Sequence, residues 1–188
     1  MSETLHIKNM VCPRCVRAVE DIARRLGLDG AEVALGRITL PAPPDDGTAT
    51  RFEEELRKAG FALARDEADK VVLAVKTALV AAVRGGLSLQ RTLPELLAPA
   101  LGSTDYDTAS RLFSRREGRT VERYLIALRV EYVKELLECR QYTVKEIAWR
   151  AGFSGVPHLS RQFKQLTGVT PTAYREGHAS SRLPLDKV

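Results

Sequence analysis

The second half of the chain contains an internal repeat, which restricts the possible folds more than any other feature of the sequence. When the sequence is aligned with itself at an offset of fifty residues, identical residues coincide throughout this half. Because each copy of such a repeat forms one supersecondary unit, we expect the two copies to share one local structure. The coinciding pairs are Ala98/Ala148, Gly102/Gly152, Ser110/Ser160, Arg111/Arg161, Phe113/Phe163, Gly118/Gly168, Thr120/Thr170 and Tyr124/Tyr174.

Each copy has the pattern of two helices joined by a glycine turn. In the second copy, Thr143 and Glu146 form a capping box that begins the first helix, and Gly152 ends it. The next helix begins near Pro157 and ends at Gly168. This pattern predicts an all-α domain of two helix-turn-helix units. A long helix between the copies fixes their separation, and its apolar stripe consists of Val121, Tyr124, Leu125, Leu128, Tyr132, Leu136 and Leu137.

The helix that begins near Pro157 is predicted to have one buried face and one outward face. Three apolar residues at helical spacing form the buried face, namely Leu159, Phe163 and Leu166. The outward face and its N-terminal flank hold Val156, Pro157, His158, Ser160, Arg161 and Lys164. In a major groove, an arginine here suits guanine, and the valine and proline offer apolar contact to a thymine methyl. An ordinary solvated basic face is the alternative, but the duplication and the excess of Lys and Arg after residue 66 favour DNA.

Residues 88–176 resemble the DNA-binding domain of the AraC-type (arabinose-regulator) transcription factors. The resemblance is carried by the second copy, IAWRAGFSGVPHLSRQFKQLTGVTPTAYR. It implies two helix-turn-helix units on a rigid helix that read successive major-groove segments of double-stranded DNA. It also places Lys164 at a phosphate contact, and it places five residues at base-reading or groove-facing positions: Val156, Pro157, His158, Ser160 and Arg161.

The first copy departs from that pattern. Asp105 and Asp107 stand where its second helix should approach DNA, and both would repel phosphate. Ala109 replaces the residue matched by Leu159, and Arg116 replaces Leu166. We therefore expect Arg111 and Arg115 to anchor phosphates, with weaker base reading than in the second copy. The acidic side chains have an alternative role, which is to accept a hydrogen bond from cytosine N4.

The first 66 residues are predicted to form an α+β domain of the ferredoxin-like βαββαβ type. Strand patterns occur at residues 4–10, 32–40 and 61–65, and the middle one reads as a hairpin around Gly36. A helix follows the first strand and is stopped by Gly27. Residues 41–50 read as a loop by composition, and a short helix follows, with Phe52, Leu56 and Ala59 on its apolar side.

The segment Cys12-Pro-Arg-Cys15 joins the first strand to the first helix. A helix N-terminus favours thiolates, and the two-residue gap lets both sulfurs reach one soft ion. The sequence NMVCPRC on a βαββαβ frame resembles the heavy-metal-associated domains of copper chaperones and soft-metal ATPases. Three roles remain open: sensing of Cu(I) or Zn, reversible disulfide formation, and a retained fold that docks a partner or dimerises. We expect His6 to be solvated and Cys139 to be a small buried residue, so neither is a predicted ligand.

Residues 67–87 are predicted to be a connector helix, and residues 177–188 a flexible tail. The apolar stripe of the connector consists of Val72, Val75, Leu79 and Val83, and Gly85-Gly86 ends the helix. The chain shows neither a signal-peptide pattern nor an apolar segment long enough to cross a bilayer, so a cytoplasmic location is expected.

The sequence therefore predicts a DNA-binding transcriptional regulator with an N-terminal module that responds to a soft metal or to redox state. The alternative is a Cu(I)-class metal carrier or adaptor whose basic half docks a protein partner. A homodimer is compatible with both functions. An enzyme is not expected, because the sequence shows no paired carboxylates, no nucleophile with a base, and no phosphate-binding glycine loop.

Overall fold

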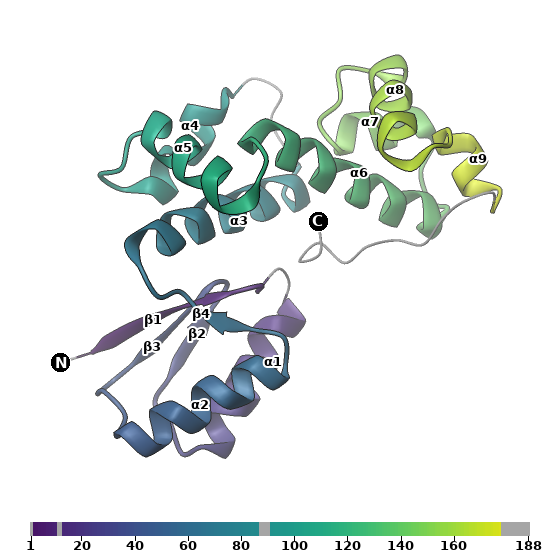
Figure 1. Ribbon diagram of the computed structural model, residues 1–188. Helices are drawn as coiled ribbons and strands as arrows, with labels where there is room; N and C mark the ends of the chain where they lie inside the picture. Colours follow the sequence, from purple (N-terminus) through teal and green to yellow (C-terminus); the bar gives the residue numbers. More distant parts are fainter. Residues whose placement is uncertain (1, 11–12, 87–90, 178–188) are drawn as a thin grey trace. The chain divides into compact units, whose positions relative to one another are not determined.

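A computed structural model describes residues 2–10, 13–86 and 91–177 (Figure 1). The chain divides into two compact units, residues 1–77 and residues 78–188. The boundary falls within helix α3 (Glu67–Arg84), in the segment that the sequence assigned to a connector. Among the described residues, no helix is long and apolar enough to span a membrane.

The first unit has the element order βαββαβ that the sequence predicted. The four strands form an antiparallel sheet in the order β2-β3-β1-β4, so the first and last strands of the unit lie side by side. Figure 1 shows α1 and α2 together on one face of this sheet. The elements are β1 (Glu3–Lys8), α1 (Pro13–Arg25), β2 (Glu32–Ala34), β3 (Arg37–Leu40), α2 (Asp46–Lys58) and β4 (Ala62–Leu63).

The core of the first unit lies between this sheet and its two helices. Strand alternation turns one side of β1 and β3 toward the helices, where Ile7 and Ile38 are fully buried. Met10, at the end of β1, is also buried in this core. The helices contribute Val19, Ile22, Ala23, Phe52 and Leu56. The main core of the first unit thus lies on one face of the sheet.

Helix α2 begins earlier than the sequence predicted, within the segment that was expected to be a loop. The carboxylate of Asp45 caps the helix and accepts a hydrogen bond from the backbone N–H of Thr48 at 3.0 Å. A hydrogen bond from the Thr48 hydroxyl, followed by this backbone cap, lowers the pKa of the Asp45 carboxyl. Composition had marked residues 41–50 as irregular, but one cap is enough to begin the helix at Asp46.

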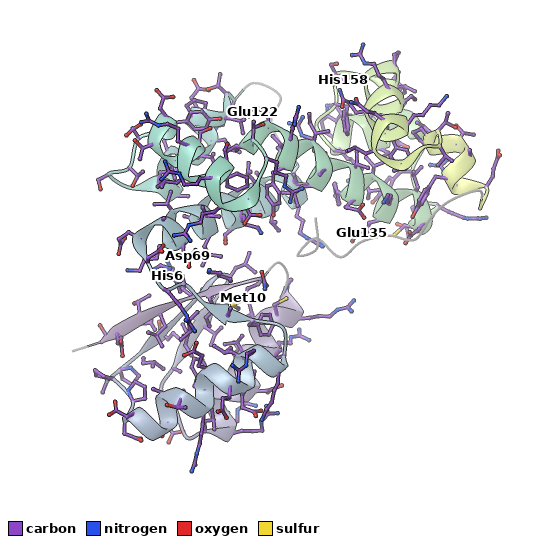
Figure 2. The ribbon with its side chains drawn as sticks, viewed as in Figure 1. His6, Met10, Asp69, Glu122, Glu135 and His158 are labelled. Atoms are coloured by element: carbon purple, nitrogen blue, oxygen red, sulfur yellow. The ribbon has the colours of Figure 1, made fainter. Side chains whose placement is uncertain are left out.

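The opposite side of β1 faces the first half of α3. Lys8 Nζ lies 2.6 Å from Asp69 Oδ2, and the His6 side chain is half-buried near the same helix (Figure 2). The expectation that His6 is solvated is therefore wrong. An alternating strand pattern predicts one exposed face, and here a helix from the end of the same unit covers part of it.

Acidification is expected to destabilise the first unit through His6. Burial lowers the pKa of this imidazole below 6.5, Lys70 and Arg37 lower it further, and Glu67 opposes them. The unfolded chain therefore binds the proton more readily, so the free energy of unfolding falls as the pH drops through 6.5. The measurement is urea unfolding of the full chain at about pH 7.5 and 5.5, compared with His6→Gln. Equal pH dependence in the two proteins would contradict this assignment.

The second unit contains the two predicted helix-turn-helix copies, α4–α5 and α7–α8, with α6 between them. Matching caps define each copy: Gly118 ends α5 and Gly168 ends α8, both in the left-handed backbone conformation. Thr143 and Glu146 form the predicted capping box of α7, with Thr143 N donating to Glu146 Oε2 at 2.7 Å. The helices are α4 (Leu93–Leu101), α5 (Tyr106–Glu117), α6 (Val121–Cys139), α7 (Val144–Arg150), α8 (Val156–Thr167) and α9 (Pro171–Arg175).

The core of the second copy confirms two of the three predicted inward residues of α8. Leu159 and Phe163 are fully buried, and the Phe163 ring packs edge-on against Tyr174 of α9 at 5.5 Å. Leu166 was predicted to be buried but is 53% exposed. The reason is that α9 covers Phe163, one turn earlier, so Leu166 lies beyond the packed layer. Arg116, which takes the place of Leu166 in the first copy, is exposed as well. An arginine at this position is therefore compatible with the core of the first copy.

Two further side chains on the surface of the second unit are notable. Trp149, the only tryptophan of the chain, is 74% exposed on α7. Cys139 was expected to be buried but is exposed. Leu136 and Leu137 fill the core at the end of α6, and Cys139 follows on the last turn, next to the left-handed cap residue Arg140.

Candidate nucleic-acid interface

Helix α8 has the contrasting faces that the sequence predicted. Val156 begins the helix and is partly packed against the core, and Pro157 is its second residue, where no N–H is needed. Opposite the buried pair, the side chains of Pro157, Arg161 and Lys164 are exposed along one face. Ser160 is half-buried at the edge of that face. The outward face of α8 therefore combines an apolar N-terminal turn with two cationic groups.

His158 lies on the other edge of the face and is held by the preceding turn. Its Nδ1 lies 3.0 Å from Ser154 Oγ, and its ring packs edge-on against Phe153 at 5.4 Å. These contacts fix the plane of the imidazole. Figure 2 labels His158 in the part of the second unit that holds α7 and α8.

Sequence reasoning missed Arg129, which packs against the same aromatic ring. Its guanidinium carbon lies 5.9 Å from the centre of the Phe153 ring, and burial lowers the pKa of the side chain. The signal in the sequence was the position of Arg129 within the apolar stripe of α6, four residues after Leu125 and four before Val133, both buried. Arg129 therefore links the connecting helix to the turn that precedes α8.

In the first copy, the two acidic residues of α5 have different environments. The Asp105 carboxylate caps the helix and accepts a hydrogen bond from Thr108 N at 2.9 Å. Asp107 is exposed on the outward face. Arg111 and Arg115 are exposed as well, and Arg111 Nη2 lies 3.4 Å from the Thr108 hydroxyl. Of the two aspartates, Asp105 makes the helix cap, and Asp107 is an exposed residue of the first turn.

The thiol pair is described only in part, because Cys12 lies outside the described residues. Cys15 is in the first turn of α1 and is half-buried against the core that contains Met10. Among the described residues, no group of three or more His, Cys, Asp and Glu side chains is arranged to hold a metal ion. A site here would therefore depend on the two thiols of the CPRC segment, a donor set that fits a soft ion.

Residues 100–177 match the family model described as a helix-turn-helix domain. The helix-turn-helix-type transcriptional activator RhaR of Cronobacter sakazakii is 36% identical over 66 residues, which is 35% of this chain and 23% of that protein. The transcriptional activator NphR of a Rhodococcus species is 33% identical over 88 residues, which is 47% of this chain and 25% of that protein. The chain thus matches only about a quarter of the length of these relatives.

A solved structure agrees with the fold of the second unit. The C-terminal domain of AraT, a response regulator from Geobacillus stearothermophilus, covers 63% of this chain and 94% of its own, with a TM-score of 0.51 and 24% identity. The family-model match and this likeness in fold both show residues 100–177 as a helix-turn-helix domain. The relatives named above are transcriptional activators and not enzymes, as the sequence led us to expect.

Proposed function

We propose that the chain is a sequence-specific transcriptional regulator that binds double-stranded DNA through residues 100–177. The observation that supports this most is the outward face of α8. Pro157, Arg161 and Lys164 are exposed together there, on a helix whose opposite face is anchored by two fully buried residues. A helix held in this way presents a defined set of side chains to a major groove.

Each predicted contact residue has a role in this proposal. Arg161 donates to the O6 and N7 acceptors of guanine, while Val156 and Pro157 offer apolar contact to a thymine methyl. Ser160 and His158 flank the groove. Three cationic side chains contact phosphates and fix the position of the domain on DNA, namely Lys164, Arg111 and Arg115.

The two copies are expected to contribute unequally. Arg161→Ala should weaken binding to the preferred sequence by about 1–3 kcal/mol and relax the preference at one base position. Arg115→Ala should weaken binding to all sequences alike, because a phosphate contact carries no base information. The measurement is selection of bound duplexes from a random pool, followed by affinities at several salt concentrations.

Two outcomes would count against this function. A weak dependence of duplex affinity on salt would mean that few phosphates are neutralised, and would favour the carrier alternative, in which the basic half docks a protein. A larger shift in base preference from Arg111→Ala or Arg115→Ala than from Arg161→Ala would reverse the roles of the two copies.

We further propose that the first unit is a ferredoxin-like, heavy-metal-associated type of module that makes the regulator responsive to a soft metal or to redox state. The antiparallel order β2-β3-β1-β4 and the position of Cys15 at the start of α1 support this. Cys12 and Cys15 would hold the ion, which would add positive charge at the CPRC segment. Reversible disulfide formation and docking or dimerisation without metal are the competing roles.

A further inference from the structure

The outward face of α5 carries an exposed carboxylate in its first turn, where the charge complements the helix dipole but makes no contact that the cap requires. Asp107 and Arg111 are exposed one helical turn apart, at the positions that Pro157 and Arg161 occupy in α8. The helix cap of α5 is made by Asp105, so Asp107 is not needed for it. Within residues 91–177, no hydrogen bond or ion pair engages the Asp107 carboxylate.

The residues around Asp107 hold this face in a fixed orientation. Tyr106 precedes Asp107 and points toward α6, where its hydroxyl donates to Glu122 Oε1 at 2.9 Å. Burial and the Glu122 carboxylate raise the pKa of Tyr106 to about 12, so the phenol stays protonated and keeps donating. Of the three carboxylates at this end of α5, those of Asp105 and Glu122 are therefore engaged within the domain, and that of Asp107 is exposed.

The chemistry of a carboxylate limits what Asp107 can meet on DNA. An ionised aspartate only accepts hydrogen bonds, and phosphate oxygens are also acceptors, so the two repel. In the major groove the donors are cytosine N4 and adenine N6, and aspartate pairs with cytosine. Arg111 lies about 6 Å further along the same face, since four residues rise 1.5 Å each, and keeps its role as a phosphate contact beside that base pair.

Resting on the proposed DNA binding, we infer that Asp107 is a specificity-determining residue, which accepts a hydrogen bond from N4 of a cytosine in the segment that meets α5. The first copy then reads one base pair through Asp107 and still contributes less specificity than α8. Asp107 of the first copy is therefore a base-reading residue, although the second copy has a proline at the matching position.

The experiment compares the full chain with Asp107→Asn and Asp105→Asn by selection from a random duplex pool and by affinities for single-base variants. An asparagine pairs with adenine N6 and N7, so Asp107→Asn should change the preference at one position from cytosine to adenine. The expected change in the ratio of the two affinities is roughly 5- to 150-fold, the equivalent of about 1–3 kcal/mol. Asp105→Asn removes the same charge two residues away, keeps a capping side chain, and should leave every base preference unchanged.

Three results overturn the inference in distinguishable ways. If Asp107→Asn binds all sequences more tightly with unchanged preferences, the carboxylate only repels phosphate, and the proposed function stands. If Asp107→Asn and Asp105→Asn change the base preferences equally, the change comes from the lost negative charge and not from a contact of Asp107. If the unsubstituted chain selects no sequence from the pool, the proposed DNA binding fails and the role of Asp107 fails with it.

Discussion

Replacing Phe163 by alanine is expected to lower the free energy of unfolding of the helix-turn-helix domain by about 3–5 kcal/mol. Phe163 is fully buried, and it packs edge-on against Tyr174, whose hydroxyl donates to Glu138 Oε1 of α6 at 2.9 Å. Its removal leaves a cavity where α6, α8 and α9 meet. Because small domains are stable by about 5–15 kcal/mol, this loss is a large part of the total.

Leu166→Ala is the matched control for Phe163→Ala. It shortens an apolar side chain of the same helix, but Leu166 is mostly exposed, so the stability should change by no more than about 0.5 kcal/mol. Urea unfolding followed by far-UV circular dichroism measures both variants. Similar losses in the two would mean that Leu166 is part of the core, as its spacing in the sequence first suggested.

The largest effect on binding is expected from Cys12→Ser/Cys15→Ser, which should abolish tight binding of Cu(I). Two thiolates form a linear, low-coordinate site that favours Cu(I), whereas Zn normally takes four ligands and would need a second copy of the segment across a dimer. The measurement is competition for Cu(I) against a calibrated chelator, paired with the affinity for the selected DNA in the presence and absence of the metal. If the protein is a sensor, Cu(I) binding changes the affinity for DNA, and the double substitution removes both effects.

The exposed thiol of Cys139 supplies the control for that experiment. Cys139→Ser removes one reactive thiol far along the sequence from the CPRC segment and should leave Cu(I) binding intact. Tight Cu(I) binding with equal DNA affinity in the loaded and metal-free forms would argue against a sensor. No Cu(I) binding by the unsubstituted chain would leave docking or dimerisation as the role of the first unit.

The sequence was sufficient to predict the features that depend on local rules. The fifty-residue repeat, the capping box of Thr143 and Glu146, and the glycine ends of the helices predicted both helix-turn-helix copies. Strand alternation predicted the βαββαβ order of the first unit. The outward position of Pro157, Arg161 and Lys164 also followed from helical spacing alone.

Features that depend on contacts between distant segments were not predictable in this way. Helical spacing places Leu166 on the buried side of α8, but only the position of α9 decides how far the core extends. Strand alternation places His6 on an exposed face, but α3 covers part of that face and leaves His6 half-buried. The ring contacts of His158 with Phe153, and of Phe153 with Arg129, join α8, its preceding turn and α6.

The exposed Trp149 is an intrinsic fluorophore at a known position of the second copy. It is the only tryptophan in the sequence, and its indole is 74% exposed on α7 of the second copy. The emission of the unmodified chain therefore comes from one known place, and a dissolved quencher such as iodide can reach it. Any ligand that shields α7 would reduce that quenching, so events at the second helix-turn-helix copy can be followed without a dye and without a substitution.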